Sequence, residues 1–225
     1  MKTPIAILCC VLVTGSVLVA QEARKAHYDR PFLQDYSEKV PLLSAIHGAQ
    51  LRKVRADRNG RVVVLSDQGL LQVHEGRLKP DRLHRPLTDM QIKDMEVHQG
   101  QFVFLTDQHV LSNAWAGRLL VSHEMRDAER LAMGTAFDFL VAGSERVACF
   151  RGPDAVCELS VEGGVRQAVF DPVQKQFLVL TETALWRVTL AGEQAAVFRH
   201  GQMNCLALTD EDLWIGTSNG YLCLD

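Results

Sequence analysis

The stretch Phe177-Leu178-Val179-Leu180-Thr181-Glu182-Thr183-Ala184-Leu185-Trp186-Arg187-Val188 joins two apolar runs through three polar residues. Short apolar runs bounded by turn-forming residues are typical of strands that are buried on both faces. Runs like 177–180 recur at residues 62–65, 102–105, 139–142 and 213–216. The five runs end at intervals of 40, 37, 38 and 36 residues, and a small or hydroxyl residue follows each of them. This regular spacing indicates an internal repeat.

Each repeat also contains an upstream strand with a polar turn, and most repeats end in a further apolar segment. A unit of about 38 residues with four short strands matches one blade of a β-propeller. Neighbouring blades cover both faces of a blade, which explains why its middle strands are apolar throughout. The sequence therefore predicts an all-β fold, a propeller of about five four-stranded blades over residues 40–225. A β-sandwich is the alternative, although it does not require strands at such even spacing.

The last repeat stops before its fourth strand. We expect residues 42–46 to supply that strand beside residues 221–224, which would remove a sheet edge. Pro41 restricts such a strand to an edge position because proline cannot donate a backbone hydrogen bond.

The N-terminal residues have the layout of an export signal. Lys2 is followed by an uncharged apolar run at residues 5–20 that ends in Ala20. This pattern predicts a signal peptide at residues 1–20, with an uncleaved anchor as the alternative. Residues 21–39 are polar and charged, which predicts a flexible arm. We therefore expect a periplasmic or secreted protein with no membrane span after signal cleavage.

The composition is that of an ordinary globular domain, with 47% hydrophobic residues and a formal net charge of −3. The chain lacks a run of basic residues long enough to indicate nucleic-acid binding. Beyond the leader it keeps four cysteines. Cys149 and Cys157 flank a turn at residues 151–154, so a hairpin would place them opposite each other as a candidate disulfide. We expect no bond between Cys205 and Cys223, because one strand separates them.

No catalytic motif is present: the mature sequence contains neither a nucleophile elbow nor a zinc-helix motif, a phosphate loop or a calcium loop. We therefore predict no catalytic residues, no metal site and no cofactor. The eight histidines are scattered along the chain, and we expect them at surface or turn positions.

The loops between the second and third strands of the blades should converge at one mouth of the propeller. Several of these loops carry a carboxylate, which predicts a polar and mildly acidic entrance, although turns favour such residues in any case. The candidate ligand-binding residues are Asp67, Asp107, His109, Glu145, Glu182 and Asn219 in these loops, with Trp115 at a separate loop tip.

Charged residues also recur on the predicted innermost strands. We align Val54, Met95 and Leu131 as equivalent positions of three successive blades. One level of the channel then holds Lys53, Asp94 and Arg130, and the next odd level holds Arg55 and Glu96. Because the signs alternate around the ring, these side chains are predicted to pair across blade boundaries.

Residues 213–222, Leu-Trp-Ile-Gly-Thr-Ser-Asn-Gly-Tyr-Leu, resemble the two-component regulator propeller repeat. The first repeat resembles it loosely, and the others keep only its spacing and hydrophobicity. The resemblance implies a non-catalytic exported propeller that senses a small-molecule or glycan ligand or binds a protein partner. The alternative is the propeller part of an exported carbohydrate-active enzyme, or a fragment of a larger sensor protein.

Overall fold

The computed structural model describes residues 48–81, 84, 90–112, 119–136, 138–209 and 212–224. The predicted signal peptide, the arm, the closing strand at residues 42–46 and Trp115 lie outside these residues. Within them the chain forms strands and turns only, all in the compact unit Val40–Asp225. No helix in the described part is long and apolar enough to cross a membrane.

The strands form five antiparallel sheets, the blades, which are numbered here in chain order. Blade 1 contains β1 (Leu51–Ala56), β2 (Val62–Ser66), β3 (Gly69–His74) and β4 (Arg77–Pro80), and blade 2 contains β5 (Asp94–His98), β6 (Gln101–Leu105), β7 (His109–Ser112) and β8 (Leu119–Ser122). Blade 3 contains β9 (Arg130–Met133), β10 (Asp138–Ala142), β11 (Arg146–Arg151) and β12 (Asp154–Ser160). Blade 4 contains β13 (Val165–Asp171), β14 (Gln176–Thr181), β15 (Ala184–Val188) and β16 (Gln194–Arg199), and blade 5 contains β17 (Met203–Leu208), β18 (Leu213–Thr217) and β19 (Gly220–Leu224).

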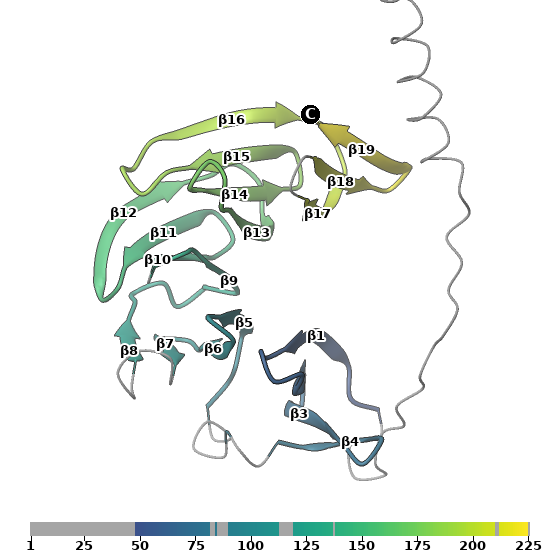
Figure 1. Cartoon of the computed structure of the whole chain (residues 1–225). Coiled ribbons are helices and arrows are strands. Elements are labelled where there is room, and N and C mark those ends of the chain that lie inside the picture. Colours follow the sequence, from purple (N-terminus) through teal and green to yellow (C-terminus); the bar gives the residue numbers. More distant parts are fainter. Residues whose placement is uncertain are drawn as a thin grey trace, which may run out of the picture. The chain divides into compact units, whose positions relative to one another are not determined.

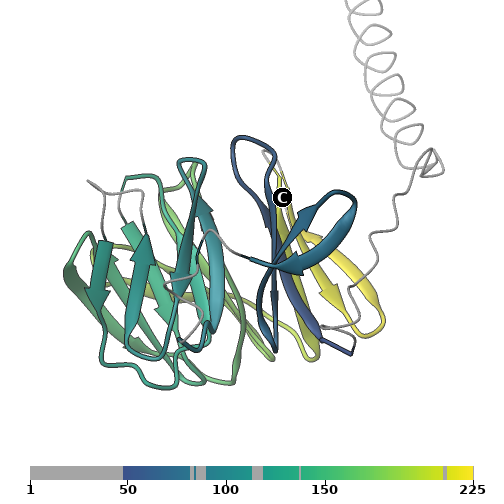
Figure 2. The same cartoon turned by 90° about the horizontal axis from the view of Figure 1, so that it is seen from below.

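The blades are arranged as a five-bladed β-propeller, which confirms the predicted fold class. In each blade the strands lie side by side in chain order, and the first strand is the innermost (Figure 1; Figure 2 shows the blades from another side). Contacts between innermost strands connect β1 to β5, β5 to β9, β9 to β13 and β13 to β17. Side chains at matching positions of successive blades therefore meet along the central channel.

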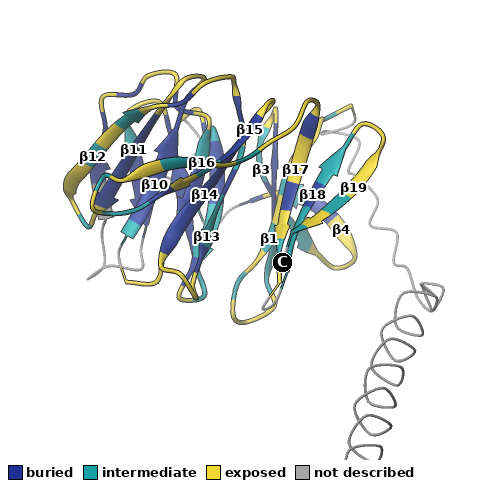
Figure 3. Cartoon of the chain, turned by 90° about the horizontal axis from the view of Figure 1, so that it is seen from above, coloured by how far each residue is buried: buried dark blue, intermediate teal, exposed yellow. Residues whose placement is uncertain are grey.

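The hydrophobic core lies between the blades. All six residues of β14 are buried, as are most residues of β6 and β10 (Figure 3). Phe139 of β10 packs into a cluster shared with blade 2, and Phe177 of β14 packs into a cluster shared with blade 3. The outer strand β12 contains only exposed and half-buried residues. Covering on both faces thus explains the continuous apolar runs of the middle strands.

Blade 5 has three strands among the described residues, as the sequence predicted for its incomplete last repeat. Its third strand, β19, contains only exposed and half-buried residues, and Tyr221 is 72% exposed. The strand that we expected to pair with β19 belongs to residues 42–46, so that pairing stays a prediction.

Three innermost strands carry an extra residue near their start. The register shifts between Leu51 and Lys53 in β1, between Val165 and Gln167 in β13, and between Met203 and Cys205 in β17. The extra residues are Arg52, Arg166 and Asn204. Such bulges redirect side chains at the end of a strand, here at the rim that also carries the loops between second and third strands.

Candidate ligand site at the central channel

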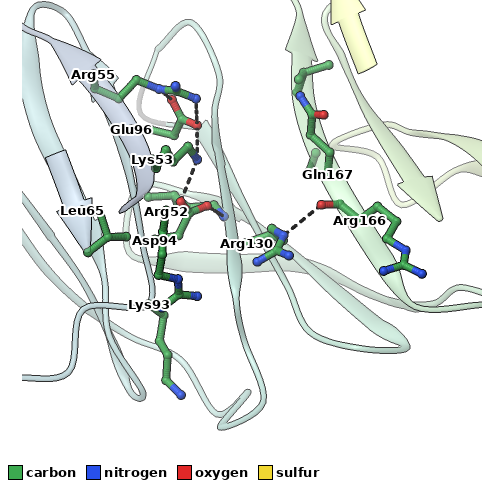
Figure 4. A pocket seen from close by; sticks show the side chains of 13 residues that line it. Arg52, Lys53, Arg55, Leu65, Lys93, Asp94, Glu96, Arg130, Arg166 and Gln167 are labelled. Atoms are coloured by element: carbon green, nitrogen blue, oxygen red, sulfur yellow. Dashed lines mark hydrogen bonds and ion pairs between the residues drawn. The ribbon is translucent and has the colours of Figure 1, made fainter. Parts of the chain in front are cut away.

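A cavity of about 450 Å³ lies against the innermost strands of blades 1 to 4. Figure 4 shows its charged side chains, which come from the innermost strands and from Lys93 just before β5. The cavity is lined by the six cations Arg52, Lys53, Arg55, Lys93, Arg130 and Arg166 and by the two carboxylates Asp94 and Glu96. Cations therefore outnumber carboxylates, whereas the loop sequences predicted a mildly acidic entrance.

The deeper level of the cavity is held by ion pairs between blades 1 and 2. The Lys53 ammonium lies 2.7 Å from an Asp94 oxygen and 2.6 Å from a Glu96 oxygen. The Arg55 guanidinium donates two hydrogen bonds of 2.8 Å to the two oxygens of Glu96. These contacts confirm the predicted pairing of Lys53 with Asp94 and of Arg55 with Glu96. The four charges at this level neutralise one another.

Further around the channel, hydrogen bonds to the backbone replace ion pairs. The second oxygen of Asp94 accepts the Leu131 N–H of blade 3 at 2.9 Å. The Arg130 guanidinium donates to the Arg166 carbonyl of blade 4 at 2.9 Å. The Gln167 amide donates to the Leu206 carbonyl of blade 5 at 2.8 Å and accepts the Leu206 N–H at 2.9 Å. Each boundary from blade 1 to blade 5 is thus bridged at the innermost strand.

Four further cations line the cavity, and we call them the rim cations: Arg52, Lys93 and Arg166 lie at the rim, and Arg130 lies one position deeper, at the level of Lys53 and Asp94. Bulges in β1 and β13 place Arg52 and Arg166 there, while Lys93 directly precedes β5 and Arg130 begins β9. No ion pair of Arg52 occurs among the described residues. Half of the Arg166 side chain (49%) and a third of the Arg130 side chain (35%) are exposed. The guanidinium groups can therefore reach a ligand in the cavity.

Two of the loop candidates stand beside these cations. Asp107 lies 3.2 Å from the Lys93 ammonium, and Glu182 lies 3.4 Å from the Arg166 guanidinium. Both carboxylates are about half exposed and neither lines the cavity. They can hold the two cations in place at its edge.

The other described candidates do not line the cavity. The Asp67 carboxylate accepts the Gln50 N–H at 2.8 Å, and Asn219 and Glu145 are exposed turn residues. His109 lines a separate cavity with His123. The sequence did contain a sign of the rim cations, because the position before the aligned Lys53, Asp94 and Gln167 is basic in three of the five blades, at Arg52, Lys93 and Arg166.

Two histidines differ from their predicted surface placement. His98 and His123 are 4% and 6% exposed. Burial lowers the pKa of both, so each is held neutral. A ring nitrogen of His123 lies 3.2 Å from the Thr106 carbonyl. Among the described residues, no group of three or more His, Cys, Asp or Glu side chains could hold a metal ion.

The pairing of Arg55 with Glu96 leads to a prediction about stability. Burial acts to raise the pKa of Glu96, but hydrogen bonds from Arg55 and the charge of Lys53 outweigh it, and the pKa lies below its usual value. A lowered carboxylate pKa stabilises the fold above the usual glutamate pKa, and this contribution is lost as the pH falls through the lowered value. A double-mutant cycle with Arg55→Ala and Glu96→Ala should therefore give a coupling of about 1 kcal/mol at pH 7, because Arg55 is partly exposed to solvent.

The coupling is measured by urea unfolding of the four proteins at pH 7 and again below pH 4. In acid the coupling should fall toward zero as Glu96 is protonated. A coupling that is absent at pH 7, or that persists unchanged in acid, would contradict the ion pair as a link between blades 1 and 2.

Comparison with known proteins agrees with this architecture. No family model and no curated protein matches the chain. Among solved structures it is similar to the extracellular domain of a hybrid two-component system from B. thetaiotaomicron, with a TM-score of 0.58, 14% identity, and coverage of 81% of this chain and 27% of that one. The chain has a β-propeller fold. At this identity the likeness shows the fold alone.

Two further solved structures show the same likeness. BamB from Moraxella catarrhalis matches with a TM-score of 0.56 and 12% identity, over 76% of this chain and 56% of that one. A protein of unknown function from Bacteroides caccae matches with a TM-score of 0.56 and 11% identity, over 80% of this chain and 79% of that one. The chain thus spans about a quarter of the sensor domain and just over half of BamB.

Proposed function

We propose that the chain is an exported, non-catalytic propeller that binds an anionic ligand at the rim of its central channel. The observation that carries the proposal is the set of four rim cations, which converge from four successive blades on one cavity. The carboxylates of the deeper level are already neutralised by Lys53 and Arg55. Lys93, Arg130 and Arg166 are paired only with carboxylates that are about half exposed, and Arg52 has no ion pair among the described residues, so these cations remain available to a negatively charged ligand.

The chemistry of the rim favours a carboxylated ligand. Arginine binds carboxylates through two parallel hydrogen bonds, and three of the four rim cations are arginines. A cavity of about 450 Å³ lies within the range of small-molecule sites. Export is supported by the apolar N-terminal run and by the resemblance of residues 213–222 to the two-component regulator propeller repeat. Acidic oligosaccharides and small carboxylates are accordingly the first ligands to test.

The proposal predicts selective and salt-dependent binding. Oligogalacturonates should bind the purified protein at low ionic strength, while neutral cello-oligosaccharides of the same length should not. Arg166→Glu together with Arg52→Glu should weaken binding at least about 10-fold, because each replaces a rim cation by a repelling charge. Among the described residues, neither side chain forms a hydrogen bond or ion pair with another blade, so the fold should persist. Titration calorimetry at two salt concentrations gives both results.

Lys175→Glu is the matched control, since this residue lies in the turn between β13 and β14 and does not line the cavity. It should bind as the unaltered protein does. Equal affinity for acidic and neutral oligosaccharides, or no effect of the rim variants, would overturn the proposal. Release of new reducing ends during incubation would instead favour the alternative of a carbohydrate-active enzyme.

A further inference from the structure

Two thiols lie opposite each other in blade 3, away from the channel. Cys149 of β11 and Cys157 of β12 are direct partners in the strand register, as the hairpin around residues 151–154 predicted. The structure holds both as free thiols. Directly opposed residues of antiparallel strands have Cβ atoms at a separation that a disulfide can bridge.

The two thiols differ in their surroundings. Cys149 is fully buried in the cluster between blades 3 and 4. Cys157 is half-buried at the edge of the same cluster, with its sulfur 4.0 Å from the Thr189 carbonyl of blade 4. A dissolved oxidant can therefore reach Cys157 first, while Cys149 is shielded by its burial.

The hydrogen bond between the two sulfurs also makes the pKa values of the two thiols differ. It lowers the pKa of Cys157 to about 7, although burial acts in the opposite direction. The same hydrogen bond, together with burial, raises the pKa of Cys149. The thiolate is the nucleophile in thiol chemistry, so the accessible thiol is also the reactive one.

We propose that Cys149 and Cys157 are a redox couple in which Cys157 attacks and Cys149 resolves. The Cys157 thiolate attacks a disulfide oxidant, such as oxidised glutathione or an exported thiol oxidase. A mixed disulfide forms, and one thiolate of the oxidant leaves. Cys149 then loses its proton and attacks the Cys157 sulfur, which releases the second thiolate. Two protein thiols become one disulfide, the oxidant gains both electrons, and the two protons pass to its two thiolates.

The couple would cross-link the outermost strand of blade 3 to its neighbour. Among the described residues, no strand pairs with the outer side of β12, so a covalent bond to β11 would resist its detachment. An oxidising compartment outside the cytoplasm is where such a bond persists. Disulfide formation between Cys149 and Cys157 does not depend on ligand binding at the channel.

Peptide mapping of the full chain tests the couple directly. The protein is incubated with oxidised glutathione, blocked with iodoacetamide and cleaved with trypsin under non-reducing conditions. Cleavage after Arg146, Arg151 and Arg166 separates the two cysteines, so peptides 147–151 and 152–166 stay joined only through a disulfide. The joined pair should appear, and iodoacetamide should modify Cys157 in the untreated protein at a lower pH than an ordinary thiol.

Two serine variants separate the roles of the thiols. Cys149→Ser should accumulate glutathione on Cys157, whereas Cys157→Ser should leave Cys149 unmodified because it is buried. A control with Cys205→Ser and Cys223→Ser should still form the joined peptides. Failure of the joined peptides to form, or equal glutathione modification of the two single variants, would overturn the proposal.

Discussion

Replacing Phe139 with alanine is expected to lower the free energy of unfolding by about 3–5 kcal/mol. Phe139 is fully buried at the second position of β10. Its ring stacks on Phe150 with centroids 4.7 Å apart, and it belongs to the cluster that contains Leu105 of blade 2 and Leu131 of blade 3. The truncation removes apolar contacts on both sides of a blade boundary and leaves a cavity there. Urea unfolding of the variant measures the loss through the transition midpoint.

The matched control is Val173→Ala, an apolar truncation in the turn between β13 and β14. Val173 is 75% exposed, so its replacement should change the free energy of unfolding by less than about 0.5 kcal/mol. Phe139→Leu should fall between the two, because leucine fills part of the space. A loss below about 1 kcal/mol for Phe139→Ala would show that the cluster between blades 2 and 3 contributes little to the fold.

The burial of Phe139 illustrates why the strands could be predicted from the sequence. In a blade covered on both faces, consecutive residues of a middle strand are all apolar, and this pattern repeats at the spacing of the blades. The repeat also fixed the alignment of the innermost strands. Because Lys53 and Asp94 occupy the same level in neighbouring blades, their opposite charges were sufficient to predict the pair.

The side-chain contacts at the other blade boundaries could not be predicted in this way. Arg130 was expected to pair with a charge across a blade boundary, but it donates to the Arg166 carbonyl instead. Every residue has a backbone carbonyl, so the sequence does not show which carbonyl accepts a hydrogen bond. The direction of Arg52 and Arg166 depends on one extra residue in their strands, and a shift of one residue reverses the face to which a side chain points.

The role of the loop candidates could also be predicted from the sequence only in part. Asp107 and Glu182 were predicted from their place in the loops between second and third strands, and the structure puts both at the edge of the cavity. Each of the two carboxylates pairs with a cation of the cavity, Asp107 with Lys93 and Glu182 with Arg166. The charge of the cavity thus depends on how neighbouring strands align, so it could not be predicted from the composition of the loops.

Asp94 connects three blades, and its replacement by alanine is expected to lower the free energy of unfolding by about 3 kcal/mol. The residue is 5% exposed. One oxygen lies 2.7 Å from the Lys53 ammonium of blade 1 and accepts the Met95 N–H at 2.8 Å, and the other accepts the Leu131 N–H of blade 3 at 2.9 Å. A buried N–H left without its acceptor costs about 1–3 kcal/mol, and the loss of one member of a buried ion pair adds to this.

Two variants of Asp94 distinguish its charge from its hydrogen bonds. Asp94→Asn keeps one oxygen for the Leu131 N–H but loses the charge and the second oxygen, which serves Lys53 and the Met95 N–H, so its destabilisation should be smaller than that of Asp94→Ala. Asp154→Ala removes a carboxylate from the exposed start of β12 and should change the free energy of unfolding by less than about 0.5 kcal/mol. Urea unfolding at pH 7 ranks the three variants. If Asp94→Ala were no more destabilising than Asp154→Ala, the bridge from blade 1 through Asp94 to blade 3 would not hold the innermost strands together. A larger loss for Asp94→Ala than for Asp94→Asn would show that the backbone hydrogen bond to Leu131 contributes to that bridge beyond the ion pair with Lys53.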